Sequence, residues 1–251
     1  MPDTDLALVR TLEACAFNAW PARQTLCHGG WLLRLSGGFT KRANSVNALA
    51  PDADTAGFAG VRAAAEVLYA RHGLPAVFRL SPLAPPEADE ELAAAGYRHF
   101  DPSRVLTASL AAAEAHASVQ VESAPTAAWL DGFAQANGVA PAHQAIHHAM
   151  VQAIALPAGF ATLHDDAGRA VGFGLAVCER GWVGFYDIVV HPGVRGRGLG
   201  RRLMHALLHW GREAGASQAY LQVRARNEVA QQLYAALGFG ELYRYHYRVP
   251  A

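Results

Sequence analysis

Apolar residues in the second half of the chain recur in two periods. In some segments they alternate with polar residues, or form short runs rich in Val and aromatic side chains, and this pattern predicts strands. In others they recur three or four positions apart, which predicts helices with one apolar face. The predicted strands span 160–164, 170–178, 182–190, 219–224 and 242–249.

Capping residues mark the ends of the predicted helices in the same half. Polar N-caps and a glycine after the last turn are the usual helix boundaries. In the last helix the pattern places Val229, Leu233 and Leu237 on one apolar face. The predicted helices are 126–136, capped by Thr126 and ended by Gly138; 141–154; a helix from Leu199 through Leu203, Leu207 and Trp210 that stops at Gly215; and a helix that Asn227 caps and Gly238 ends.

The predicted elements of the first half follow the same order as those in the later part of the second half. A helical stripe through Val61, Ala65 and Leu68 ends at Gly73, and a second helix spans 87–95. The predicted strands of this half are 31–35, 44–49, 76–80 and 104–108.

Two anchors relate the halves by the same offset. Gly96-Tyr97 corresponds to Gly238-Phe239, and Ser45-Val46 corresponds to Asp187-Ile188, each at a separation of 142 positions. We therefore expect one α/β (α+β) fold present twice, each copy a mixed, mostly antiparallel sheet flanked by helices.

An alanine-rich, low-complexity segment at 111–117, followed by 118–125, is the candidate linker between the two copies. Because alanine is the best helix former, 111–117 could instead be a helix. The predicted domains are 1–118 and 119–251.

Composition sets limits on this picture. The chain has 251 residues, of which 52% are hydrophobic and 17% charged, which supports a well-buried core and excludes bulk disorder. Its 21 basic and 21 acidic residues balance, so we expect no nucleic-acid partner. No apolar run approaches the ~18 residues of a membrane helix, and the first ten residues carry Asp3 and Asp5 instead of a secretory signal. Three cysteines (Cys15, Cys27 and Cys178) without metal or redox spacing favour a reducing cytoplasm.

The balanced charge hides one unbalanced window. Residues 191–202 contain four arginines and four glycines and no acid, between a predicted strand and a predicted helix. Glycines allow a tight turn that gathers backbone N–H groups, the helix adds its free N-terminal N–H groups, and arginines match phosphate. The window predicts a diphosphate site; the alternative is a glycine-rich turn with solvated arginines. It matches neither the P-loop nor the dinucleotide fingerprint.

Residues 187–201, Asp-Ile-Val-Val-His-Pro-Gly-Val-Arg-Gly-Arg-Gly-Leu-Gly-Arg, resemble the acetyl-CoA loop of the GCN5-related N-acetyltransferases (GNAT), whose pattern is Arg/Gln-x-x-Gly-x-Gly/Ala. Residues 221–239 resemble the second signature of this family, a helix with Asn, Tyr and Gly-Phe at Asn227, Tyr234 and Gly238-Phe239. The whole chain is similar to bacterial tandem GNAT proteins whose first half is degenerate.

The resemblance implies a role for each residue of the two motifs. The backbone of β-strand residues Ile188, Val189 and Val190 would pair with the pantetheine arm of acetyl-CoA and bind the thioester carbonyl. Asn227 would contact the arm, and Tyr234 would stand near the sulfur. The diphosphate would lie on Arg195, Gly196, Arg197, Gly198, Leu199, Gly200 and Arg201.

Acetyl transfer needs an acid and a base. A tyrosine of pKa ~10 can protonate a leaving thiolate whose thiol has a pKa near ~8.5, so Tyr234 is the predicted general acid; helix periodicity alone would make it a core aromatic. Some relatives carry a glutamate base where this chain has Gln222, and others an acid near Gly184. Asp187 and Glu179 are the nearby carboxylates. A water relay and an amine of low pKa are equal alternatives to them, and we assign no base.

Other polar patterns in the sequence are weaker evidence of a functional site. His143 and His147, like His205 and His209, are four positions apart, but no H-E-x-x-H motif accompanies them, so we expect no metal. Cys178 is expected to be a buried inert thiol. The polar run 40–45 either lines a substrate cleft between the domains or forms a hairpin loop.

The sequence thus predicts an acetyltransferase that moves acetyl from acetyl-CoA to a primary amine on a small molecule or peptide, through a tetrahedral intermediate. Asp52 and Asp54 in the first half would repel a diphosphate, so we expect one cofactor site per chain. The second hypothesis is a non-catalytic acyl-CoA-binding or sensor protein. The third, which the sequence favours less, is an enzyme that uses a different acyl donor or an alcohol acceptor. The acceptor, the general base, the role of the first half and the oligomeric state are left open.

Overall fold

The computed structural model describes residues 5–50, 57–110 and 117–251. Asp52, Asp54 and most of the alanine-rich segment at 111–117 lie outside the described residues. Contacts within the chain divide it into two compact units: unit 1 comprises 1–105, 223–227 and 241–251, and unit 2 comprises 106–222 and 228–240. The domain boundary expected near residue 118 stays a prediction.

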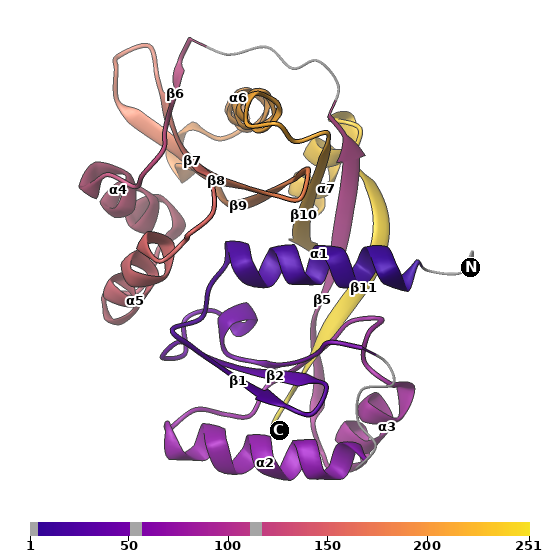
Figure 1. Cartoon of the computed structure of the whole chain (residues 1–251). Helices are drawn as coiled ribbons and strands as arrows, with labels where there is room; N and C mark the ends of the chain where they lie inside the picture. Colours follow the sequence, from indigo (N-terminus) through magenta and orange to yellow (C-terminus); the bar gives the residue numbers. More distant parts are fainter. Residues whose placement is uncertain (1–4, 51–56, 111–116) are drawn as a thin grey trace. The chain divides into compact units, whose positions relative to one another are not determined.

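Unit 1 is a mixed sheet with helices on both faces (Figure 1). Its strands follow the order β1-β2-β3-β4-β11, in which β3 and β4 run parallel and the other neighbours antiparallel. The elements are α1 (Leu6–Ala19), β1 (Gln24–His28), β2 (Trp31–Leu35), the 3-10 helix η1 (Lys41–Ala43), β3 (Val46–Ala48), α2 (Phe58–Arg71), β4 (Phe78–Leu80), α3 (Pro86–Ala94), the start of β5 (Arg98–Ser109) and β11 (Gly240–Val249).

The two faces of the unit 1 sheet bury different chemistry. On one face, Phe58 of α2 packs on Trp31 and Phe78, with ring centroids 5.2 and 5.6 Å apart. On the other, α1 brings Glu13 onto Arg79 of β4, and both side chains are 2% exposed. The Tyr243 hydroxyl donates to Glu13 at 2.5 Å. Unit 1 therefore has an aromatic core under α2 and a buried ion pair under α1.

Unit 2 is also a mixed sheet between helices. Its strands follow the order β10-β9-β8-β7-β6, in which β9 and β10 are parallel and the others antiparallel. The elements are β6 (Val119–Glu122), α4 (Ala127–Asn137), α5 (Pro141–Gln152), β7 (Ala158–His164), β8 (Ala170–Glu179), β9 (Trp182–Val190), the 3-10 helix η2 (Pro192–Val194), α6 (Leu199–Glu213), β10 (Gln218–Arg224) and α7 (Glu228–Ala236).

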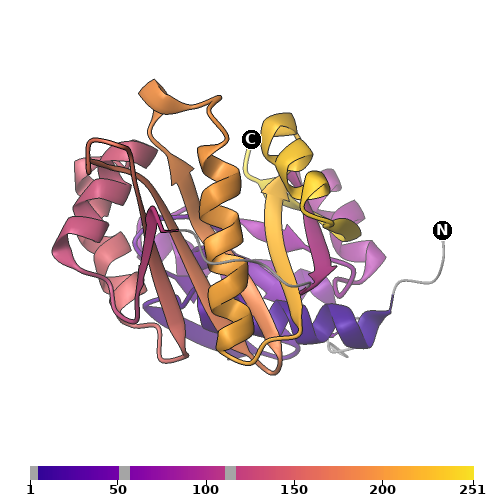
Figure 2. The ribbon, with the colours of Figure 1, turned by 90° about the horizontal axis from the view of Figure 1, so that it is seen from above.

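Glycines on the unit 2 strands and helices allow close packing on both faces of the sheet. A Cβ at Gly174 of β8 would lie 2.8 Å from Leu207 of α6, and a Cβ at Gly132 of α4 would lie 2.2 Å from Phe173 of β8. Figures 1 and 2 show α6 along one face of these strands and α4 on the other. Helices therefore pack closely on both faces of the unit 2 sheet, in which β9 lies between β8 and β10.

Most predicted elements are confirmed within one to three residues, and the capping residues Thr126 and Gly138 act as expected. Besides the two short 3-10 helices, three elements were not predicted: α1, β1, and β6, which lies inside the segment expected to be a linker. β5 starts at Arg98, well before the predicted 104–108. In the described part of the chain, no helix is long and apolar enough to cross a lipid bilayer.

Candidate functional site

The parallel strands β9 and β10 pair over only part of their length. The register runs from Trp182 opposite Gln218 to Phe185 opposite Leu221 and ends there. Beyond Phe185, β9 continues to Val190 along β8. The two parallel strands therefore separate halfway along β9, which leaves the edge of Ile188–Val190 that faces away from β8 open to an extended ligand.

A β-bulge lies at the point where the strands separate. Leu175 of β8 opposes Tyr186 and Phe173 opposes Val189, so Asp187 and Ile188 together face Gly174. Asp187 has a φ of 51°, which is uncommon for a residue other than glycine. Such bulges turn backbone and side-chain groups out of the regular ladder, and they are frequent beside active sites.

A hydrogen bond between two side chains joins β9 and β10 near the point where they separate. The hydroxyls of Tyr186 on β9 and Tyr220 on β10 lie 2.7 Å apart. Gly184 makes room for this contact, because a Cβ there would lie 2.5 Å from Tyr220. The separation of β9 from β10 thus begins next to the Tyr186–Tyr220 contact.

The glycine and arginine loop follows β9 directly. Gly196 and Gly198 have φ values of 78° and 72°, a backbone conformation that glycine adopts without strain, and α6 starts at Leu199. The Nε of Arg195 donates to the Val190 carbonyl at 2.9 Å and folds the loop back onto the strand. Arg197 and Arg201 are exposed beside the first turn of α6. The loop therefore places free helix N–H groups and positive charge at the end of the open strand edge.

Tyr234 is the buried residue of α7. Its ring packs on Phe239 at 6.0 Å, and Phe239 packs on Phe185, the last β9 residue paired with β10, at 6.3 Å. Burial raises the pKa of Tyr234 to about 12, so the phenol is protonated at neutral pH. The predicted apolar stripe of this helix is wrong at Val229, which is 81% exposed, because the helix turns Tyr234 and not Val229 toward the sheet.

The other motif residue of this region, Asn227, immediately precedes α7. Its backbone N–H donates to the Arg224 carbonyl at 3.0 Å, which closes the turn between β10 and the helix. Asn227 belongs to unit 1, whereas the loop, the bulge and Tyr234 belong to unit 2.

Sequence reasoning missed one pair at the bulge. The Nε2 atom of His147, on α5, lies 2.8 Å from Oδ2 of Asp187. The His147 side chain is fully buried, and that of Asp187 is 10% exposed. Phe133 of α4 stacks on the imidazole, with centroids 4.7 Å apart. The spacing of His143 and His147 raised only the question of a metal site, which the sequence did not favour, and 40 positions separate His147 from the carboxylate that it contacts.

The positions of Asp187, Glu179 and Gln222 relative to the bulge differ. Glu179 opposes Trp182 at the far end of β9 from the bulge, and it pairs with Arg180 at 3.4 Å. Gln222 directly follows the last paired residue of β10. Among these three side chains, Asp187 is the carboxylate at the bulge.

Two other predictions concern Cys178 and metal binding. Burial raises the pKa of Cys178 to about 11, which agrees with an inert thiol. Among the described residues, no three His, Cys, Asp or Glu side chains lie close enough together to hold a metal ion.

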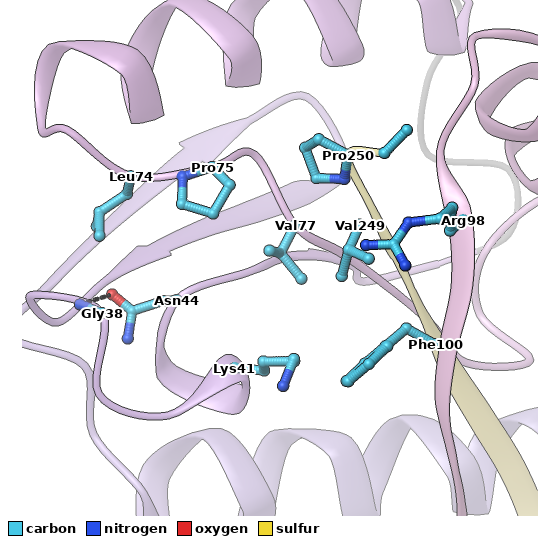
Figure 3. Close-up of a pocket in the computed structure, with 11 residues that line it drawn as sticks. Gly38, Lys41, Asn44, Leu74, Pro75, Val77, Arg98, Phe100, Val249 and Pro250 are labelled. Atoms are coloured by element: carbon cyan, nitrogen blue, oxygen red, sulfur yellow. Dashed lines mark hydrogen bonds between the residues drawn. The ribbon is translucent and has the colours of Figure 1, made fainter. Parts of the chain in front are cut away.

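The polar run 40–45 belongs to unit 1. Asn44 holds it in shape: its Oδ1 accepts from the backbone N–H groups of Ser36 and Gly38, and its Nδ2 donates to the carbonyls of Phe39 and Thr40, at 2.7–2.9 Å. The run lines a cavity of about 510 Å³ within this unit (Figure 3).

Comparison with known proteins identifies the family. The family model described as "Probable histone acetyltransferase Rv0428c C-terminal" matches residues 6–248. The uncharacterized N-acetyltransferase YobR of Bacillus subtilis (strain 168) is 31% identical over 250 residues, which cover 96% of this chain and 98% of YobR.

Solved structures show the same fold at low identity. A GCN5-related N-acetyltransferase from Kribbella flavida superposes with a TM-score of 0.72 at 15% identity, covering 96% of this chain and 95% of that one. A tandem GNAT protein from the clavulanic acid biosynthesis pathway gives a TM-score of 0.63 at 16% identity, covering 82% and 74%. The chain is therefore an acyltransferase of the GNAT superfamily and belongs to the family of the Rv0428c C-terminal acetyltransferase.

Proposed function

We propose that this protein transfers an acetyl group from acetyl-CoA to an amine. The observation that carries the proposal is the separation of β9 from β10 at a bulge, with a glycine and arginine loop and the start of α6 at the end of the open edge. A cleft of this form suits a long donor with an amide-containing arm and a diphosphate.

The loop suits the diphosphate. Its two left-handed glycines let the backbone turn its N–H groups outward, and the first N–H groups of α6 carry the positive end of the helix dipole. Arg197 and Arg201 are exposed and can bind phosphate oxygens in a bidentate manner. Arg195 acts differently, because its bond to Val190 shapes the loop.

The open edge of β9 suits the pantetheine arm. The arm carries two amides, and an extended amide chain can pair with Ile188–Val190 as an added strand. The bulge turns backbone N–H groups away from β8, where they can stabilise the oxyanion that forms when the amine attacks the thioester carbonyl.

Tyr234 suits the role of general acid. The amine nitrogen forms a bond to the carbonyl carbon, the carbon–sulfur bond breaks, and the thiolate takes the proton of the Tyr234 hydroxyl. Burial raises the pKa of this phenol to about 12, above that of a free thiol, so solvent returns the proton to the phenolate after the step.

Asp187 suits the role of proton acceptor for the amine. It lies at the bulge beside the proposed oxyanion site, and its second oxygen is held by His147 at 2.8 Å. When the carboxylate is ionised, the imidazole Nε2–H donates to it and fixes its orientation. His147 is fully buried and is a positioning residue rather than the acceptor itself.

We further propose one donor site per chain, in the C-terminal copy of the fold, and a supporting role for the N-terminal copy. In both units three antiparallel strands are followed by a fourth, which runs parallel to the third and is connected to it by one helix: β1–β4 with α2, and β7–β10 with α6. This likeness supports the domains 1–118 and 119–251. The acceptor is a primary amine on a small molecule or a peptide.

A thiol-release assay with a panel of amines, read against calorimetric binding of acetyl-CoA, tests the proposal. We expect at least one amine to raise thiol release above the rate with acetyl-CoA alone, and Asp187→Asn to abolish the increase without loss of binding. Tight binding without turnover on any amine would overturn the proposal in favour of an acyl-CoA sensor. Release with alcohols and not with amines would identify an O-acetyltransferase.

A further inference from the structure

Unit 1 contains a cavity of about 510 Å³ that takes no part in the function proposed above. It lies at the amino ends of the parallel strands β3 and β4, beside the start of β5 and the end of β11 (Figure 3). All its lining residues belong to unit 1, whereas the bulge, the loop and Tyr234 belong to unit 2. Its volume is that of a small-molecule site.

Two positive side chains face this cavity. Figure 3 shows Lys41 and Arg98 directed into it from η1 and β5. The described lining contains no Asp or Glu side chain. The nearby carboxylate of Asp101 pairs with Arg224 at 3.3 Å, and it also acts to raise the pKa of Lys41, which burial lowers more strongly.

Lys41 is held over an aromatic ring. Its Nζ lies 4.4 Å from the centroid of Phe100, a geometry in which the ring partly stabilises the charge. Burial is the main cause that lowers the pKa of Lys41 below its ordinary value. An anion in the cavity would favour the charged amine and so would bind with a gain in free energy.

The rest of the wall is apolar. Leu74, Val77 and Val249 line the cavity, and Phe100, at 36% exposure, has a free ring surface. Inorganic phosphate, which is small and strongly hydrated, would leave these walls without a partner. An anion with an apolar body would contact both parts.

The cavity is preformed. Asn44 binds four backbone groups of the loop that carries Lys41, so this wall is fixed before any ligand arrives. A fixed wall lowers the entropy lost on binding.

We propose that this cavity of unit 1 binds a small organic carboxylate, with its acid group between Lys41 and Arg98 and its apolar body against Phe100 and Val77. The geometry assigns charge recognition to the two cations and selectivity for an apolar body to the ring and the aliphatic walls. This site does not depend on the acetyl-transfer function and can be tested without acetyl-CoA.

The sequence offers a direct probe, because Lys41 is the single lysine of the chain. Reductive methylation with ¹³C-formaldehyde labels Lys41 and the α-amine, keeps the positive charge, and gives one lysine resonance to follow by NMR. Hexanoate and benzoate are titrated into the full-length protein, with hexanamide and benzamide as neutral matched controls.

We expect the carboxylates to shift the lysine resonance in a saturable manner with a Kd of about 1 mM, and the amides to leave it unchanged. Arg98→Met should weaken carboxylate binding about tenfold, because one of two cations is lost. Arg23→Met, which removes an exposed arginine outside the cavity, should have no effect.

Three results would overturn the proposal. One is a lysine resonance that does not move at about 10 mM carboxylate. The second is an equal response to carboxylates and amides. The third is binding that appears only after deletion of Pro250 and Ala251, which would show that the chain itself fills the cavity. Unchanged circular dichroism of Arg98→Met excludes loss of folding as the cause of weaker binding.

Discussion

The two residues that carry the proposed chemistry differ in what holds them. Tyr234 is placed by aromatic packing, through Phe239 to Phe185. Asp187 is placed by a bulge with a left-handed backbone and by a hydrogen bond to a buried imidazole. Loss of the phenol hydroxyl removes the proposed proton donor, whereas loss of the Asp187 carboxylate or of its His147 partner affects the proposed proton acceptor.

Tyr234→Phe should lower kcat about 100-fold and leave the Kd for acetyl-CoA unchanged within about twofold, because the ring still packs and only the proton donor is lost. Burial raises the pKa of Tyr234 to about 12, so the donor stays protonated below that pH. The wild-type kcat should therefore show no fall attributable to Tyr234 between pH 7 and about 10. Turnover over this range, measured by thiol release for both proteins, checks the prediction, and an unchanged kcat in the variant would remove the acid role.

His147 should act through Asp187. His147→Gln keeps an amide donor near Asp187 and should retain about a tenth or more of wild-type kcat, whereas His147→Leu should lose about 100-fold. In both variants KM for acetyl-CoA should stay near the wild-type value, and His164→Leu on β7 serves as the matched control. Equal losses in the Gln and Leu variants, with equal melting temperatures, would argue against a hydrogen-bonding role.

Pairs of this kind mark the limit of what the sequence alone can predict. The loop 195–201 and Tyr234 stand in motifs with fixed spacing, so the sequence alone could single them out as candidates, and their roles stay predictions. His147 and Asp187 are 40 positions apart and meet because α5 places the imidazole against the bulge of β9. The φ of Asp187 likewise depends on two-against-one pairing with β8, which no local pattern reveals.

At the scale of elements, prediction succeeded where one face of a strand or helix is buried and a cap marks its end. The strands β7 to β10 and the helices α4 and α6 follow this rule. β6 was missed because its burial alternates between half-buried and exposed residues at the sheet edge, without a strong apolar period. α1 was missed although Asp5 caps it, and its buried face includes Glu13, which breaks the apolar stripe.

The buried pair that α1 makes with β4 should control the stability of unit 1. Glu13→Gln leaves Arg79 buried and without its counter-ion, which should cost about 3–5 kcal/mol in the free energy of unfolding. Glu90→Gln, an exposed position on α3, should change it by less than about 0.5 kcal/mol. Urea unfolding followed by circular dichroism measures both, and a midpoint for Glu13→Gln within error of wild type would contradict the prediction.

At the scale of the whole molecule, the two units share a strand arrangement but differ in the loop after the third antiparallel strand. In unit 2 that loop carries Arg195, Arg197 and two left-handed glycines before α6, and the first turn of α6 adds Arg201 and Arg202. In the first half the corresponding segment carries Asp52 and Asp54. The same backbone arrangement can therefore serve donor binding in one copy and carry a different site, such as the Lys41 cavity, in the other.

Calorimetric titration with acetyl-CoA should accordingly give one site per chain. The diphosphate needs positive charge and N–H groups at the start of the connecting helix, and the acids of the first half would repel it. Arg197→Ala combined with Arg201→Ala should weaken binding by about 3 kcal/mol, since each charged hydrogen bond contributes about 1.5 kcal/mol or more. Arg212→Ala, an exposed arginine in the last turn of the same helix, should leave the affinity unchanged. A stoichiometry of two equal sites, or loss of binding in Arg212→Ala equal to that of the double variant, would show that the charge at the start of α6 does not select the donor.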